Sequence, residues 1–285
     1  MPPYGYTFAR NWCKSYLLGD AMNERPDYNM RYLWSTTLVS AMGGLLFGYD
    51  WVVIGGAKPF YEKFFNLTTP SQVGWAMSSA LVGCLIGALV SGGLSDRFGR
   101  KKLLILAGFL FTVSAVWTGL ANSFTVFVVF RLIGGVGIGL ASNLSPMYIA
   151  EISPARMRGR FVSVNQLTIV IGILAAQLAN WLIAEPVAAG ATAADILASW
   201  NGQNGWRWMF GAEAVPALLF FLLMFLVPES PRWLVKKGRP GEATRVLAKV
   251  GGAGFAEEAL ADIRATLSVD EIGRVRFRDL LEPGL

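Results

Sequence analysis

The sequence predicts an all-α integral membrane protein with six transmembrane helices and a small cytoplasmic helical segment. The chain of 285 residues is 54% hydrophobic and 15% charged, and its mean hydropathy is +0.46. That composition is too apolar for a soluble domain of this length. Six hydrophobic runs each reach about 20 residues or more, which is the length a helix needs to cross a hydrocarbon core of about 30 Å.

The runs follow one another with short connections, and each is expected to form one helix. They cover residues 32–57, 72–94, 102–121, 124–152, 161–184 and 206–227. The chain therefore divides into a cytoplasmic N-terminal segment at 1–31, a transmembrane bundle at 32–228 and a cytoplasmic helical segment at 229–285. In the last segment, apolar residues recur at helical spacing over 241–250 and 255–267, which predicts two amphipathic helices.

Small residues recur at every fourth position in two of the runs. The second run has Ser79, Gly83, Gly87 and Ser91, and the fourth has Gly135 and Gly139. Such rows let helix backbones approach closely in lipid, so we expect them to be packing surfaces.

Basic residues indicate the orientation of the bundle. Lys and Arg gather after the second, fourth and sixth runs and are sparse in the opposite connections. Because cytoplasmic loops collect Lys and Arg, both termini are expected on the cytoplasmic side of the cell membrane. Topology thus explains the net charge of +6 without a nucleic-acid partner.

Several classes of chemistry are excluded by composition. The chain has no histidine, which removes histidine triads, imidazole metal sites and histidine proton relays. Its two cysteines, Cys13 and Cys84, are too few for a disulfide framework or a thiolate metal site. No phosphate loop and no cytoplasmic nucleophile with a paired base is evident. We therefore expect a protein that is not an enzyme, with no metal and no cofactor, and any proton transfer must use carboxylates.

Three charged residues lie inside the hydrophobic runs at one depth. Asp50, Arg131 and Glu213 each lie seven residues from the outer end of their run, about 10 Å below the membrane boundary. Opposite charges attract strongly in such a medium, and intramembrane charges usually mark a transport pathway. We hypothesise that Asp50 pairs with Arg131 when deprotonated and releases it when protonated, with Glu213 modulating the pair. The alternative is a static salt bridge that only fixes helix packing.

The fifth run carries a polar stripe on one helix face. Its members, at spacings of three or four, are Gln166, Ile169, Ile173, Gln177 and Asn180. Amide side chains both donate and accept hydrogen bonds, which suits a ligand rich in hydroxyl groups. Hydrogen bonding between helices is the alternative for Gln177 and Asn180, and Gln166 is the favoured ligand contact.

Six motifs in register resemble the sugar porter family of the major facilitator superfamily. They are G-G-L-L-F-G-Y-D at 43–50, G-G-L-S-D-R-F-G-R-K at 92–101, R-L-I-G-G-V-G-I-G at 131–139, P-M-Y-I-A-E-I-S-P-A-R-M-R-G-R at 146–160, N-Q-L-T-I-V-I-G-I-L at 165–174 and P-E-S-P-R-W-L at 228–234. Their order and spacing are also those of the family.

The resemblance implies specific roles. Asp50 corresponds to an aspartate that titrates in proton symporters of the family, Arg131 to its partner and Glu213 to a neighbouring carboxylate. Gln166 corresponds to a glutamine that hydrogen-bonds sugar hydroxyls. A cytoplasmic charge network that latches the two halves of the family fold is implied for Asp96, Arg97, Arg100, Glu151, Arg158, Glu229 and Arg232. For the basic members, membrane orientation alone is the alternative.

The resemblance covers only the first half of a twelve-helix fold, in which the ligand binds between two six-helix halves. A truncated gene or a fragment is the favoured explanation, and a half-carrier that works as a homodimer or with a separate second half is the alternative. The implied function is proton-coupled monosaccharide symport by alternating access, with protons, a monosaccharide and the lipid bilayer as partners. Facilitated diffusion and a non-transporting sugar sensor remain open.

Overall fold

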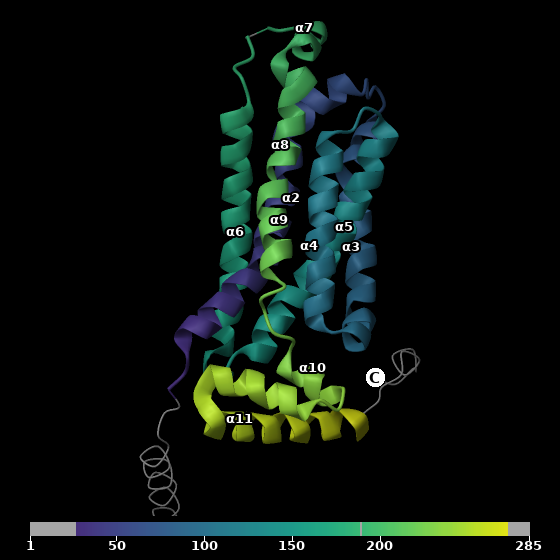
Figure 1. The fold of residues 1–285 in the computed structure, drawn as a ribbon. Coiled ribbons are helices and arrows are strands. Elements are labelled where there is room, and N and C mark those ends of the chain that lie inside the picture. Colours follow the sequence, from purple (N-terminus) through teal and green to yellow (C-terminus); the bar gives the residue numbers. More distant parts are fainter. Residues whose placement is uncertain (1–26, 189, 273–285) are drawn as a thin grey trace, which may run out of the picture.

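A computed structural model of the chain describes residues 27–188 and 190–272, in which every regular element is a helix (Figure 1). Six helical stretches are long and apolar enough to cross a membrane. The predicted six-helix bundle is confirmed. The segments at 1–26 and 273–285, which contain Cys13 and the end of the predicted cytoplasmic helical segment, lie outside the described residues.

The first five spans are single long helices. They are α2 (Met30–Phe64), α3 (Pro70–Phe98), α4 (Arg100–Gly119), α5 (Phe124–Ile152) and α6 (Arg158–Ile183), with a 3₁₀ turn, η1 (Ala155–Met157), leading into α6. Several extend beyond the predicted runs. The prediction followed apolar content alone, whereas α2 begins at the Asn29 cap, whose side chain accepts a hydrogen bond from the Tyr32 amide.

The sixth span is interrupted, where one continuous helix was expected. It consists of a π turn, η2 (Asn201–Gly205), then α8 (Trp206–Ala212) and α9 (Ala214–Leu223), which meet at Glu213. Pro216 lies three residues after the break and has no amide hydrogen to donate to the carbonyl of Ala212 one turn earlier. The proline therefore accounts for the break that places Glu213 between two helices.

The spans stand side by side, and two further helices lie across one end of the bundle (Figure 1). These are α10 (Pro231–Lys236) and α11 (Pro240–Ile272), while the short α7 (Ala193–Ala198) lies at the opposite end. α11 is two helical stretches joined at Gly251 and Gly252, where Gly252 has a φ of +81° that favours glycine. The break falls between the two predicted amphipathic stretches. We call the end that carries α10 and α11 the charged end.

Glycines allow the closest helix crossings. A Cβ atom on Gly83 or Gly87 of α3 would overlap the carbonyl oxygens of Leu132 and Val136 on α5. A Cβ on Gly48 of α2 would likewise overlap a backbone carbonyl of α6. The small residues predicted as packing surfaces therefore bring backbones into direct contact, as expected for helices that associate in lipid.

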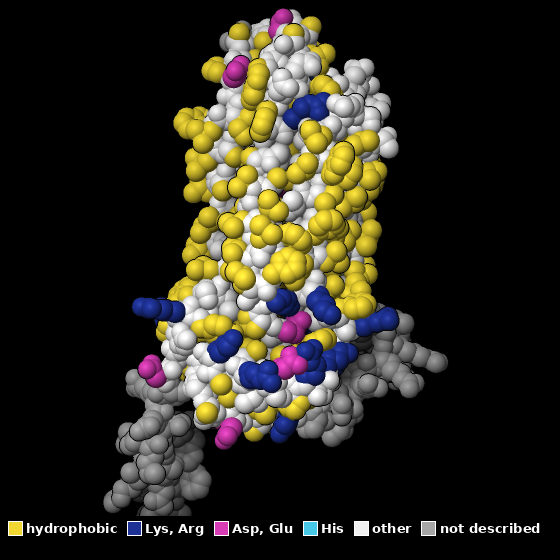
Figure 2. Space-filling model, viewed as in Figure 1, with side chains coloured by type: hydrophobic (Ala, Val, Ile, Leu, Met, Phe, Trp, Pro, Cys, Tyr) yellow, Lys and Arg dark blue, Asp and Glu magenta, His cyan; other side chains and the backbone are white. Residues whose placement is uncertain are grey.

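The surface matches the bundle's length and composition. Figure 2 shows hydrophobic side chains over the middle of one face and Lys, Arg, Asp and Glu gathered around the charged end. Leu89 of α3 is 75% exposed and Val215 of α9 is 74% exposed, which a monomeric soluble protein rarely tolerates over a large patch. This is the surface of a multi-pass membrane protein.

Candidate functional site

The structure brings Asp50 and Arg131 together inside the bundle. Asp50 lies midway along α2, and its Oδ1 accepts a hydrogen bond from Nη1 of Arg131 on α5. Their side chains are only 7% and 4% exposed, so both are largely buried. Counting residues from the helix ends thus placed the two charges at one level, whereas their depth in a membrane and the proton-coupling role stay predictions.

Glu213 completes a cluster of three charges. It is 3% exposed at the break between α8 and α9, and it interacts electrostatically with both Asp50 and Arg131. Within the described part of the chain, Oε1 of Glu213 and Nε of Arg131 are buried without a hydrogen-bond partner. The guanidinium also lies 5.4 Å from the ring centroid of Phe210. The cluster therefore keeps unused donor and acceptor capacity.

A cavity of about 240 Å³ reaches the ion pair from between α2 and α3. Asp50 of α2 and Arg131 of α5 are the charged residues in its wall. Apolar side chains from α2, α3 and α5 form most of the remaining wall. The apolar part includes Trp51, Ile54, Met77, Leu81 and Ile138. The pair is thus buried but open on one side to a small void that a water molecule or a small group could enter.

The polar stripe of α6 is divided in the structure. Gln166 and Ile169 line a second cavity, of about 400 Å³, between α2, α5 and α6. Ile173 and Gln177 are exposed on the same helix. Asn180 is 6% exposed and donates from Nδ2 to the carbonyl of Val53 at 3.3 Å. Asn180 therefore has the helix-packing contact that was the alternative for it, while Gln166 lines a cavity and its role as a ligand contact stays a prediction.

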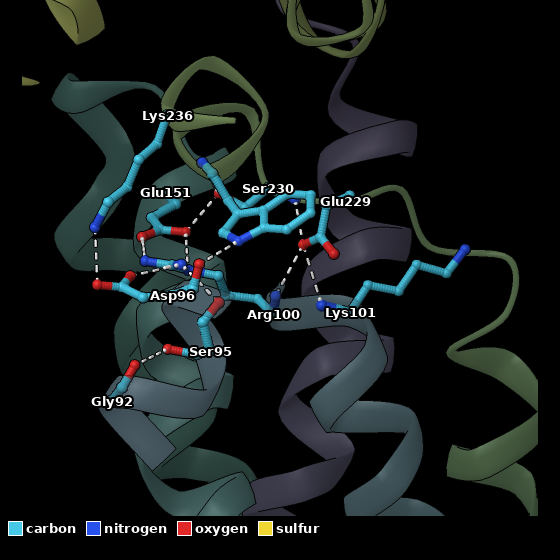
Figure 3. Close-up of polar contacts among 10 residues, drawn as sticks. Gly92, Ser95, Asp96, Arg100, Lys101, Glu151, Glu229, Ser230 and Lys236 are labelled. Atoms are coloured by element: carbon cyan, nitrogen blue, oxygen red, sulfur yellow. Dashed lines mark hydrogen bonds and ion pairs between the residues drawn. The ribbon is translucent and has the colours of Figure 1, made fainter. Parts of the chain in front are cut away.

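Arg100 organises the charge network at the charged end (Figure 3). Its Nε and Nη2 donate to the two carboxylate oxygens of Glu151 on α5, both at 3.0 Å. Its Nη1 donates to Oδ1 of Asp96 at 3.2 Å and to the carbonyl of Ser95 at 3.1 Å. A bidentate pair of this kind is geometrically specific, and it ties α4 to α5 and to the end of α3.

Glu229 acts as a cap for α4. The helix follows Gly99, which has no side chain to accept the first amide hydrogens. Oε1 of Glu229 instead accepts from the backbone amides of Arg100 at 3.0 Å, Lys101 at 3.1 Å and Ser230 at 2.8 Å. A carboxylate at a helix N-terminus is also favoured by the helix dipole. The segment before α10 is thereby fixed to the base of α4.

The other predicted network members are placed differently. Arg97 is exposed, with its guanidinium 5.2 Å from the ring centroid of Phe98, and Arg158 is exposed at the start of α6. Arg232 is half-buried and lies beside Glu151 around a shared pocket. Side-chain and backbone hydrogen bonds thus join Asp96, Arg100, Glu151 and Glu229, while Arg97 and Arg158 lie at the rim.

Three further residues join the network without having been predicted. Lys236 donates to Oδ2 of Asp96 at 2.8 Å, and Trp233 donates from its indole to the carbonyl of Asp96 at 3.1 Å. The Ser230 hydroxyl donates to Glu151 and also caps α10. A serine before a proline is a recognisable helix start, so that signal could have identified Ser230.

The comparisons with known proteins agree with this architecture. Residues 36–279 match the family of sugar (and other) transporters. The chain belongs to this family. Its predicted resemblance to the sugar porters of the major facilitator superfamily is confirmed, and this is a family of transporters, not of enzymes.

The chain is similar to several bacterial members of the sugar transporter family. The chain is 42% identical to the D-xylose-proton symporter of Escherichia coli K12, covering 84% of this chain and 52% of the symporter. It is 44% identical to a glucose transport protein of Synechocystis, covering 89% of this chain and 52% of the relative. It is 37% identical to the arabinose-proton symporter of Bacillus subtilis, covering 90% and 53%. The chain therefore spans about half the length of the curated relatives it matches.

Solved structures give the same result. A proton:xylose symporter of the major facilitator superfamily, bound to 6-bromo-6-deoxy-D-glucose, superimposes with a TM-score of 0.79 at 39% identity. The match covers 86% of this chain and 55% of that one. The partially occluded, inward-open xylose transporter of E. coli matches with a TM-score of 0.77 at 40% identity, covering 84% and 60%. The six-helix bundle thus corresponds to rather more than half of the major facilitator fold of these transporters.

Proposed function

We propose that this chain forms the N-terminal half of a proton-coupled monosaccharide symporter that works by alternating access. The observation that carries the proposal is the buried ion pair of Asp50 and Arg131 beside Glu213. Relatives named as proton symporters for D-xylose, arabinose and galactose support the choice of coupling ion and substrate class. An intramembrane carboxylate paired with a cation is a common device of proton-driven transporters.

Protonation of Asp50 would be the coupling step. A neutral Asp50 loses most of its attraction for Arg131. The guanidinium is then free to turn toward Oε1 of Glu213, which has no hydrogen-bond partner among the described residues. The three charged groups sit on α2, α5 and the α8–α9 break, so a change of partner acts between helices. Arg131 paired with Asp50 and Arg131 paired with Glu213 would be two states, and proton binding would shift the equilibrium between them.

Sugar would bind on the face that holds Gln166. Its cavity has hydroxyl and amide groups and no charged side chain among its lining residues. A site at the midplane between two halves needs a second set of contacts, so a second half of the same protein, a separate chain or a second copy would complete it.

We further propose that the charged end faces the cytoplasm, with both termini on that side of the cell membrane. Arg100, Lys101, Lys102 and Lys236 gather there, as the positive-inside rule requires. The residue ranges 1–31, 32–228 and 229–285 would then be the N-terminal segment, the membrane bundle and the cytoplasmic helical segment.

Sugar-driven proton movement tests the proposal. Membrane vesicles that contain the protein as its native gene produces it are suspended in lightly buffered medium and given D-xylose, L-arabinose, D-glucose or D-galactose. One of these sugars should make the medium more alkaline, and its accumulation should collapse when a protonophore is added. Uptake without proton movement would instead establish facilitated diffusion. Sugar binding without any uptake would establish a sensor.

A further inference from the structure

Helix α2 carries an aromatic side chain into each of the two cavities described above. The ion-pair cavity, of about 240 Å³, is lined by Asp50 and Arg131, and the Gln166 cavity, of about 400 Å³, is lined by Gln166. Phe47 lies in the wall of the Gln166 cavity, and Trp51 lies in the wall of the ion-pair cavity. Because four residues separate the two aromatic side chains, they are neighbours on one face of the helix.

Phe47 and Trp51 form an aromatic pair. Their ring centroids lie 6.2 Å apart, and the ring planes are inclined by 51°. Rings at this distance attract each other and prefer particular relative orientations. Trp51 is 54% exposed and Phe47 is half-buried, so both rings present surface that a ligand can reach. A change in the orientation of one ring therefore changes the preferred orientation of the other.

We infer that Phe47 and Trp51 are positioning residues that link sugar binding in the Gln166 cavity to proton binding at Asp50. The inference rests on the proposed function, since it assigns the connection between the two sites of the symporter. A sugar in the Gln166 cavity packs its apolar C–H groups against the Phe47 ring and fixes the orientation of that ring. The Trp51 indole turns with it and narrows the ion-pair cavity.

The indole acts on Asp50 through water. Water in the ion-pair cavity favours the charged carboxylate, and an indole that displaces this water favours the neutral acid. The titratable or charged groups that face Asp50 or its ion-pair neighbours are Arg131 of α5, Cys84 of α3, Glu213 at the α8–α9 break, and Tyr49 and Tyr61 of α2. Helix α6 has no charged residue over 161–183. None of these groups lines the Gln166 cavity, so a sugar there acts on Asp50 through the two rings.

The coupling is reciprocal and limited in size. If a bound sugar favours the protonated form of Asp50, protonation of Asp50 must tighten sugar binding by the same factor. The contact between two aromatic rings can transmit a coupling of about tenfold at most. We therefore expect the sugar dissociation constant to be lower in mildly acidic than in mildly alkaline buffer, by a factor of up to about ten.

Sugar binding in these two buffers tests the link. The wild type and its variants are purified in detergent from membranes of the native host, with whatever chains accompany them. Equilibrium dialysis then gives dissociation constants for D-xylose, L-arabinose, D-glucose and D-galactose. Trp51→Leu should bind the wild type's preferred sugar equally well in both buffers, because the indole is lost while Phe47 and Gln166 remain. Trp51→Phe keeps a ring at this position and should restore part of the pH dependence.

A matched control and the wild type itself decide the outcome. Trp208→Leu makes the same change on α8, where Trp208 is 64% exposed and lines neither cavity, and it should keep the wild-type pH dependence. If Trp51→Leu also keeps it, the inference is wrong while the symporter proposal stands. If the wild type binds sugar equally well in both buffers, the inference is again wrong, and proton movement in vesicles decides the symporter proposal separately. If the wild type binds no sugar, both fail.

Discussion

The two charge clusters of this molecule are built in opposite ways. At the charged end, the guanidinium of Arg100 has two carboxylate partners and a carbonyl, and Glu229 accepts three backbone hydrogen bonds. Inside the bundle, Arg131 donates a side-chain hydrogen bond to Asp50, and neither its Nε nor Oε1 of Glu213 has a partner among the described residues. One cluster is nearly saturated and the other is not.

This difference indicates that the cluster at the charged end is a fixed structural contact, whereas the cluster in the bundle can change hydrogen-bond partners. A saturated network offers no alternative partner, so breaking any contact only costs free energy. A cluster of two carboxylates and one guanidinium can exchange partners when one carboxylate gains a proton, because the guanidinium still has an acceptor beside it. We therefore expect variants in both clusters to change stability in proportion to burial, and only variants in the bundle to change coupling as well.

The largest effect on stability is expected from Arg131→Met. The substitution leaves Asp50 buried without its cation, and removal of one partner from such a pair costs about 3–5 kcal/mol of unfolding free energy. The double variant Asp50→Asn with Arg131→Met should recover most of this loss. Denaturant titration in mixed micelles, followed by tryptophan fluorescence, measures both. If Arg131→Met and the double variant lost the same unfolding free energy, the side chains of Asp50 and Arg131 would not be coupled.

Glu151→Gln should have the next largest effect. It replaces the bidentate acceptor of Arg100 with a neutral amide where both side chains are about a tenth exposed or less, and it should lower the unfolding free energy by about 2 kcal/mol. Glu257→Gln makes the same change on an exposed part of α11 and serves as the control. Should the two variants unfold at the same denaturant concentration, the network would contribute nothing to the fold.

Glu229→Ala should cost about 1 kcal/mol, the typical value of a helix cap. The loss is local, because the carboxylate serves the first amides of α4 and the amide of Ser230. Hydrogen exchange followed by mass spectrometry should report faster exchange at the start of α4 and unchanged exchange at the start of α3, which has its own Thr69 capping box. Unchanged exchange at Arg100 and Lys101 would contradict the capping role.

Lys236→Met should have the smallest effect. Its pair with Asp96 is 46% and 49% exposed, and exposed ion pairs contribute well under about 1 kcal/mol. The midpoint of denaturation should move little, and high salt should produce a similarly small change in the wild type. A loss as large as that of Glu151→Gln would show that Lys236 is an integral part of the network.

Much of the fold could be predicted from the sequence, because the length and hydropathy of a run are enough to identify a membrane helix. The level shared by Asp50 and Arg131 followed from residue counting, since helix rise is constant. The break at Glu213 was missed, although Pro216 was its visible signal. Lys236 and Trp233 could not be assigned to the network, because their positions depend on how α10 folds back beneath α3. The polar stripe on α6 is divided in the structure, because the spacing of its residues did not reveal which of them pack against α2.

Proton coupling at Asp50 is the central claim, and Asp50→Asn tests it most directly. Asparagine keeps the shape of the side chain and removes its ability to gain and lose a proton. We expect the variant, in vesicles with an imposed proton gradient, to exchange labelled sugar across the membrane but not to accumulate it above the external concentration. Accumulation equal to that of the wild type would contradict the account, because the proton would then have to bind elsewhere.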